Sequence, residues 1–231
     1  MRTTFKLVKA LAVLSALLPL CALGQTGTII YDNSAPTSDL NRTYGLNGTE
    51  FGDQITFAAG VSNPVIDDFK FEYFLSGNAT GNETVQLFLR DMDGPNITVT
   101  RPDGSTATIP SPGTVIYTSP VLTLQAGFNT AEASQFLAPV TGSSITWSVV
   151  FSNVGAGVTA GLSVYDPVSV GSSFSDFWQK NGGTWNTEVF ADGTPANFAA
   201  RVTAVPEPTT LAFGLLAGLA WFGFRGFKRR E

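Results

Sequence analysis

The sequence predicts an all-β protein: one antiparallel β-sandwich, jelly-roll-like, between an N-terminal signal peptide and a single C-terminal transmembrane helix. Three observations lead to this fold class. Apolar residues recur with period two through the middle of the chain, turn-forming clusters interrupt them, and each end carries an apolar run beside basic residues. The 231 residues therefore divide into a signal peptide (1–24), one sandwich domain (25–204) and a C-terminal segment (205–231).

The N-terminal segment has the layout of a secretory signal peptide. Basic residues come before the apolar run 10–20, and small residues follow it. This order predicts cleavage between Gly24 and Gln25. A bacterial lipoprotein signal is the alternative, and it would make Cys21 the first mature residue. Cleavage after Gly24 would remove Cys21, the single cysteine of the chain, so the mature protein would have neither a disulfide nor a thiolate.

The clearest strand signals lie in the three segments 68–75, 85–90 and 144–151. In the first of them every second residue is apolar, with Phe69 and Phe71 on one face and charged residues on the other. Such alternation is typical of a strand that buries one face. Weaker strand candidates cover residues 28–31, 54–58, 114–118, 121–124, 161–165, 173–178 and 198–203.

Turn signals separate these strands. Clusters rich in Gly, Pro, Asn and Asp occupy residues 93–95, 102–104, 111–113 and 181–183. No stretch of ten or more residues has helical periodicity, and no internal repeat indicates a propeller. About ten short strands in this length of chain predict a single sandwich.

An uninterrupted apolar run covers residues 211–224 near the C-terminus. It contains glycines where a buried helix would favour Ala or Leu, and it stops at a basic cluster. We therefore predict a transmembrane helix, with a buried core helix as the alternative. The positive-inside rule places the basic cluster in the cytoplasm and the sandwich on the other side of the membrane. This membrane-stop cluster consists of Arg225, Lys228, Arg229 and Arg230.

The tripeptide Pro206-Glu207-Pro208 precedes the apolar run. Motif, helix and basic end in this order resemble the PEP-CTERM sorting signal of Gram-negative bacteria, a tail also known as an ice-binding protein C-terminal domain. The resemblance implies that residues 205–231 hold an exported precursor at the inner membrane. An exosortase would recognise Pro206, Glu207 and Pro208 and remove the helix, leaving the protein at the cell surface or outside the cell. Two prolines keep the motif extended, which suits entry into an enzyme cleft.

The sandwich domain is itself similar to the choice-of-anchor domains that accompany such tails. The similar stretch is a strand followed by the Asp-x-Asp-Gly turn 91–94, then residues 112–117 leading into 121–124. This second resemblance implies a fold and no activity.

Composition and charge exclude several classes of function. The chain has no His, which removes Ser-His-Asp and Cys-His catalysis and His-ligated metals. Six basic and sixteen acidic residues lie between positions 25 and 204, a net charge of −10 that repels nucleic acid. We therefore expect no nucleic-acid partner, no cofactor, no metal site and no catalytic residue.

Asp91-Met92-Asp93-Gly94 is the one motif that suggests a metal. Alternating carboxylates before a Gly resemble the start of a calcium loop, but Pro102 stands where an EF-hand loop has its final Glu. A turn, in which Asp and Gly suit the backbone, is the alternative. The sequence leaves open whether calcium binds at Asp91 and Asp93.

The aromatic residues Phe177, Trp178 and Trp185 lie in a segment rich in Ser, Gly and Asn. Exposed rings beside amides form platforms on which sugars stack, so these three residues are candidates for sugar binding. The alternative is that they close one end of the sandwich. Asp176 and Glu188 lie in the same segment and are the acids for a glycosidase hypothesis, which needs two carboxylates at a set separation.

These features favour an exported, non-enzymatic cell-surface or extracellular-matrix protein with an exosortase-type processing enzyme as partner. The alternative function is a carbohydrate-binding module associated with exopolysaccharide. A glycan-degrading enzyme is the third hypothesis.

Overall fold

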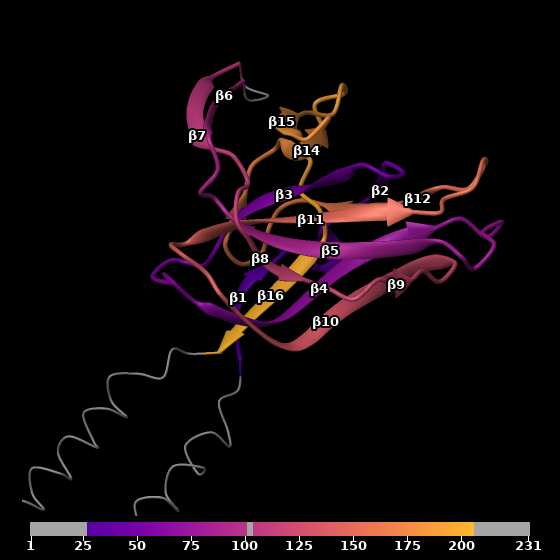
Figure 1. Cartoon of the computed structure of the whole chain (residues 1–231), viewed down its shortest axis with the longest axis horizontal. Helices are drawn as coiled ribbons and strands as arrows, with labels where there is room; N and C mark the ends of the chain where they lie inside the picture. The colour runs from indigo at the N-terminus through magenta and orange to yellow at the C-terminus, as the bar shows by residue number, and fades with distance from the viewer. Residues whose placement is uncertain (1–26, 101–103, 206–231) are drawn as a thin grey trace, which may run out of the picture.

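A computed structural model describes residues 27–100 and 104–205. Within these residues the chain forms sixteen β-strands and one three-residue 3-10 helix at Pro36–Ser38. The strands form two antiparallel sheets packed face to face as a sandwich, and a separate two-stranded hairpin (Figure 1). The predicted all-β sandwich is therefore confirmed.

The first sheet is built around the long strand β4. Strands β12 and β16 pair with successive halves of β4, and β10 pairs with it along its whole length. Strand β1 extends the sheet beyond β16, and β2 extends it beyond β12. The strands of this sheet are β1 (Thr28–Asp32), β2 (Asp39–Tyr44), β4 (Val65–Leu75), β10 (Gly127–Pro139), β12 (Ala160–Tyr165) and β16 (Ala200–Val205).

The second sheet has the strand order β15-β14-β3-β11-β5-β8, with the short strands β13 and β9 pairing with β3 and β5. Its members are β3 (Glu50–Thr56), β5 (Thr84–Asp91), β8 (Val115–Thr118), β9 (Leu122–Thr123), β11 (Ser144–Ser152), β13 (Ser172–Ser173), β14 (Phe177–Asn181) and β15 (Thr184–Glu188). The remaining strands, β6 (Asn96–Thr100) and β7 (Thr106–Pro110), form a hairpin inserted between β5 and β8.

The core lies between the two sheets and follows the period of two. Along β4, Phe69 and Phe71 point inward and are buried, whereas Lys70 and Glu72 point outward. Trp147 of β11 packs between the sheets, with its ring centroid 5.2 Å from that of Phe69. Because side chains alternate between faces, each strand contributes every second residue to this core.

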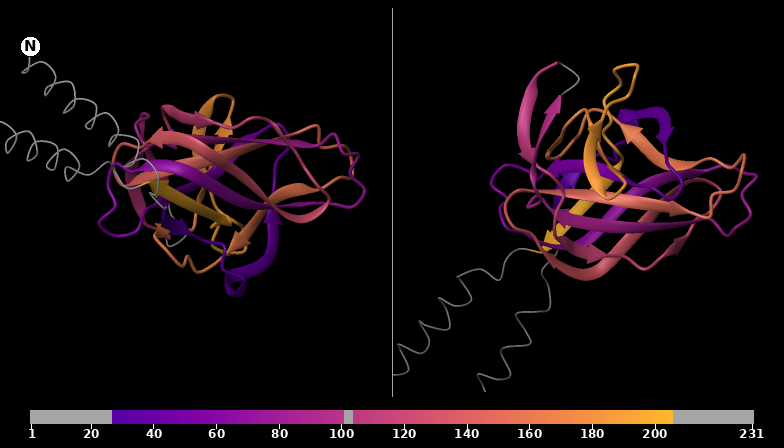
Figure 2. Two further views of the ribbon diagram at one scale, coloured as in Figure 1. Left: turned by 90° about the horizontal axis from the view of Figure 1, so that it is seen from below. Right: turned by 45° about the horizontal axis from the view of Figure 1, so that its top comes forward.

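The two ends of the described chain lie together. Strands β1 and β16 are paired, so that Thr28 faces Ala204 at the end of the sandwich seen at the lower left of Figure 1. The β6–β7 hairpin and the β14–β15 hairpin, which forms one edge of the second sheet, lie at the top of that view. The right view of Figure 2 also shows them at the top, away from the end where β1 and β16 meet.

Several sequence expectations need correction. The estimate of about ten strands was too low, since it missed β2, β6, β7, β10 and β15. Strand β10 is thirteen residues long, but its Ala, Ser, Thr and Asn residues show little apolar alternation. The expected strand 173–178 is split between β13 and β14.

Within residues 27–100 and 104–205 no helix has the length and apolar character needed to cross a membrane. The predicted signal peptide, the Pro206-Glu207-Pro208 motif, the transmembrane helix and the basic cluster lie outside the described residues.

Candidate functional site

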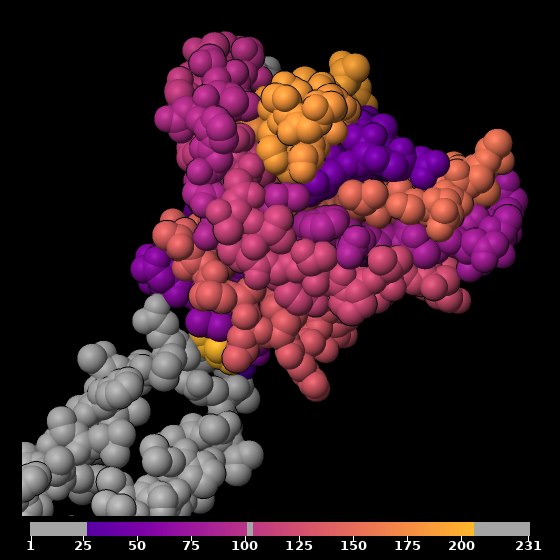
Figure 3. Space-filling model, in the orientation of Figure 1, coloured from indigo at the N-terminus to yellow at the C-terminus, as the bar shows by residue number. Residues whose placement is uncertain are grey.

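A second, smaller apolar cluster lies on the outer face of the second sheet, between the two hairpins. Trp178 and Trp185 come from β14 and β15, and Val99 from β6 closes over them. Figure 3 shows the two hairpins side by side at the top of the molecule, in magenta and orange. The cluster also includes Met92, Ile97, Ala107 and Ile109.

Local sequence explains why both Trp rings reach this face. Phe177 points into the main core, so the next residue, Trp178, points outward. Gly182 and Gly183 have positive φ values of 57° and 89°, which let the chain turn back tightly into β15. Trp185 then lies on the same face as Trp178, with ring centroids 6.4 Å apart and planes at 87°.

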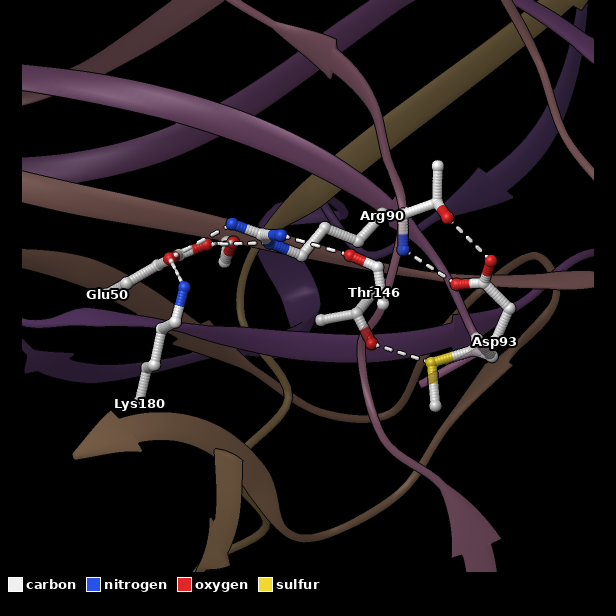
Figure 4. Close-up of polar contacts among 9 residues, drawn as sticks. Glu50, Arg90, Asp93, Thr146 and Lys180 are labelled. Carbon is white, nitrogen blue, oxygen red and sulfur yellow. Dashed lines mark hydrogen bonds and ion pairs between the residues drawn. The ribbon is translucent and has the colours of Figure 1, made fainter. Parts of the chain in front are cut away.

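A polar cluster lies next to these rings, with Glu50 of β3 at its centre (Figure 4). The Arg90 guanidinium of β5 donates to both Glu50 oxygens, from Nε at 2.8 Å and from Nη2 at 3.2 Å. The Lys180 ammonium of β14 donates to Glu50 Oε2 at 3.3 Å, and the Ser148 hydroxyl of β11 donates to Oε1 at 2.8 Å. One carboxylate therefore connects four strands of the second sheet.

The side chains of Glu50 and Arg90 are each about 10% exposed, so their charges are largely removed from water. The guanidinium carbon of Arg90 lies 5.5 Å from the centre of the Trp185 ring, and the Lys180 nitrogen lies 5.4 Å from it. Both cations therefore also contact the negative face of an aromatic ring. Three side chains donate to the Glu50 carboxylate, and one of them, Lys180, joins the β14–β15 hairpin to β3.

The Asp91–Gly94 segment forms the base of the inserted hairpin. Asp93 Oδ1 accepts a hydrogen bond from the Thr114 backbone N–H, and Oδ2 accepts one from the Thr114 hydroxyl, each at 2.6 Å. These hydrogen bonds lower the pKa of the Asp93 carboxyl. Asp91 Oδ1 accepts a hydrogen bond from the Thr141 backbone N–H at 3.2 Å. The two carboxylates thus join segments of the chain, as expected of the turn.

In the described part of the chain, no three Asp, Glu, His or Cys residues are grouped as a metal site would require. Next to Asp93, the Thr146 hydroxyl donates to the Met92 sulfur at 2.9 Å, which ties the hairpin base to β11 (Figure 4).

The predicted sugar-stacking residues are not exposed. Phe177, Trp178 and Trp185 are 2%, 1% and 7% exposed, respectively. Phe177 belongs to the main core, and the two Trp rings fill the space between the two hairpins. Stacking on a sugar needs an accessible ring face, so these three residues do not form the platform that the sequence suggested.

The acids of the glycosidase hypothesis lie on adjacent segments, because Phe177, which follows Asp176, pairs with Glu188. Asp176 is buried, and its charge contributes to raising the pKa of Asp53.

Asp53 of β3 is a buried carboxyl that the sequence analysis did not single out. Burial raises its pKa well above the ordinary value, although the Ser173 hydroxyl lies 2.8 Å from both of its oxygens. The pattern Phe51-x-Asp53-x-Ile55 contains the signal, since period two places Asp53 on the inward face.

Glu50, Arg90 and Lys180 were also missed. Each occupies an ordinary outward position on its own strand, and no local pattern connects three residues so far apart in the chain.

Comparison of the chain with protein-family models, with curated proteins and with solved structures found no match.

Proposed function

We propose that this chain is an exported, non-enzymatic cell-surface or extracellular-matrix protein. A PEP-CTERM-like segment would hold its sandwich at the inner membrane until an exosortase-type enzyme removes that segment. The observation that best supports this proposal is the pairing of β1 with β16, which brings Thr28 opposite Ala204. The predicted signal peptide and sorting segment would therefore join the sandwich at the same end, which would leave the rest of its surface directed away from the membrane.

The strand order supports the finer, jelly-roll description of the sandwich. One sheet contains the order β2-β12-β4-β10, and the other contains β3-β11-β5-β8. Eight strands divided between two sheets in this order are typical of a jelly roll, which consists of two Greek keys. Strands β1 and β16 extend the first sheet, and the hairpin β14–β15 extends the second.

The polar cluster supports a role without catalysis. The carboxylate of Glu50 is occupied by Arg90, Lys180 and Ser148, so it holds the hairpin in place. A general acid or base needs a side chain that can exchange its proton with a substrate. The cluster is arranged for stability of the second sheet.

Attaching a C-terminal tag and following its removal tests the sorting proposal. In a Gram-negative host that carries the sorting enzyme, we expect the mature protein to lose the tag. Glu207→Gln should leave the tag attached, whereas Glu231→Gln, an acid outside the motif, should be processed as the wild type is. Retention of the tag by the wild type, or normal processing of Glu207→Gln, would contradict the proposal.

A further inference from the structure

A pair of aromatic rings, one exposed and one half-buried, lies on the outer face of the first sheet. Phe74 of β4 and Phe128 of β10 face each other in register, with ring centroids 4.8 Å apart. Phe128 is 65% exposed. On the other side of Phe74 the register partner is Gly161 of β12, a buried glycine against which the backbone of Tyr44 and Gly45 packs closely. Phe128 therefore presents accessible apolar ring surface to solvent, and the half-buried Phe74 ring packs beside it.

Polar residues continue along the same face. Beyond the rings, Glu72 faces Thr130, and Lys70 then faces both Glu132 of β10 and Arg201 of β16. The left view of Figure 2, from below, shows the sheet that contains these strands. We call this surface the β4–β10 face; it comprises Lys70, Glu72, Phe74, Phe128, Thr130, Glu132 and Arg201.

A small cavity of about 150 Å³ opens on the β4–β10 face. Ser34, Lys70, Glu72, Thr130 and Arg201 contribute polar groups to its lining. Pockets for drug-sized ligands are usually about 300–1,000 Å³ in volume. This cavity therefore suits one small polar unit of a longer ligand, with neighbouring units lying along the face.

Ion pairs and hydrogen bonds orient the charged groups around the cavity. Lys70 Nζ lies 3.3 Å from Glu132, and Arg201 Nη2 lies 2.8 Å from Asp32. Glu72 accepts a hydrogen bond from the Tyr165 hydroxyl at 2.7 Å. Each cation is already neutralised by a carboxylate, yet ammonium, guanidinium and carboxylate groups have further hydrogen-bonding positions free for a ligand.

We propose that the β4–β10 face binds a neutral glycan chain, with Phe74 and Phe128 stacking against one sugar and the cavity binding the hydroxyl groups of a neighbouring sugar. A sugar ring has an apolar C–H face that matches an aromatic ring, and its hydroxyls both donate and accept hydrogen bonds. Lys70, Arg201, Ser34 and Thr130 supply donors, and Glu72 supplies an acceptor.

The charge of the molecule selects a neutral glycan over an acidic one. The cations of the face are paired, so no net positive charge attracts an anion. The sandwich as a whole carries a net charge of −10 between residues 25 and 204, which repels acidic polysaccharides. This inference goes beyond the proposed sorting function and does not depend on it, because binding is measured without processing.

Affinity electrophoresis and calorimetry on the full-length chain, kept in a detergent without a sugar headgroup, test this proposal. The probes are the neutral polysaccharides β-glucan, glucomannan and dextran, with polygalacturonate as the acidic comparison. We expect binding to at least one neutral polysaccharide, weakened about tenfold or more by Phe128→Ala. Lys70→Met, which keeps an apolar stem without the ammonium, should also weaken it. Leu137→Ala on the same strand, 72% exposed, is the matched control and should bind as the wild type does.

Failure of all three neutral polysaccharides to bind would overturn the proposal. Equal binding by Phe128→Ala and the wild type would also overturn it, as would binding to polygalacturonate alone. Sedimentation analysis adds a further test, because a dimer abolished by Phe128→Ala would identify a second copy of the chain as the occupant in place of a glycan. Thermal melts of the variants test whether they are folded. Failure of tag removal in the sorting assay would leave the glycan-binding result unaffected.

Discussion

Glu50 shows how this protein accommodates charges that are largely removed from water. Its carboxylate accepts hydrogen bonds from two cations and a hydroxyl. These bonds replace the hydrogen bonds to water that burial removes. Ser148 is small enough for the long Arg90 side chain to reach across β11 towards Glu50. Removing one member of such a buried pair leaves the other charge unpaired, which costs more than the pair itself contributes.

We therefore expect Glu50→Ala to lower the free energy of unfolding by about 3–5 kcal/mol. Lys70→Ala is the matched control, because the Lys70–Glu132 pair is 38% and 46% exposed. Pairs of that kind contribute about 0–1 kcal/mol. Chemical denaturation followed by circular dichroism measures both changes. Similar losses of unfolding free energy in the two variants would show that the Glu50 ion pairs contribute no more than an exposed pair.

Asp53 should make stability depend on pH. Burial raises the pKa of its carboxyl well above 3.8, so the folded state retains the proton over a range in which the unfolded state releases it. Its contribution to stability is fully present below about pH 4 and is lost as the pH rises towards the folded-state pKa.

Asp53→Asn keeps the shape of the protonated acid without its titration. We expect this variant to be more stable than the wild type at neutral pH, with the difference shrinking towards pH 4. Asp68, whose pKa burial and the neighbouring Glu132 raise to about 6, changes stability in the same direction in both proteins, so the comparison isolates Asp53. Parallel stability curves for the two proteins, measured by denaturation from pH 4 to 8, would contradict the assignment.

At the scale of the elements, the two hairpins enclose an apolar cluster that is separate from the main core. Strands β5 and β8 pair directly, and Asp93 joins Thr114 at the base of the inserted β6–β7 hairpin. The insertion therefore does not interrupt the second sheet. Its apolar residues instead cover Trp178 and Trp185.

Replacing residues 95–110 with a short Gly-Ser turn should leave the sandwich folded and its unfolding cooperative. Trp178 and Trp185 would lose the cover of Val99, so we expect tryptophan fluorescence to shift to longer wavelength and to be quenched more strongly by acrylamide. Trp147, which lies in the main core, should remain protected. Loss of cooperative unfolding in this variant would show that the hairpin is required by the sandwich itself.

At the scale of the whole molecule, net charge and the absence of disulfides determine the response to solution conditions. Between residues 25 and 204 there are sixteen acidic and six basic residues. The excess negative charges repel one another, most strongly at low salt. Signal cleavage after Gly24 would also remove Cys21.

We expect the melting temperature of the protein without its end segments to rise as NaCl increases to ~0.15 M, where screening is already substantial. Reductant should have no effect, and CaCl₂ should act only through ionic strength, because Asp91 and Asp93 already accept hydrogen bonds from the chain. Thermal melts in NaCl, CaCl₂ and chelator measure these effects. A rise of several degrees at micromolar Ca²⁺ would show a specific site.

The elements with strong apolar alternation could be predicted from the sequence, and those without it could not. The segments predicted at 68–75, 85–90 and 144–151 correspond to β4, β5 and β11, because each buries one continuous apolar face. Residues 127–139 form β10 because they pair with β4 along its length, although their own sequence shows little apolar alternation. Pairing with a partner strand is a tertiary interaction that a local window of sequence does not contain.

The sequence by itself determined the fold class, the inward residues of the main strands and the acidic character of the domain, because period two and charge are local properties. Only the tertiary structure decided which aromatic rings are accessible. Trp178 and Trp185 looked like surface residues in a polar segment, yet the β6–β7 hairpin covers them, whereas Phe128 is exposed in a strand that the sequence did not reveal. Burial depends on which distant segments pack over a residue, and that packing exists only in the folded chain.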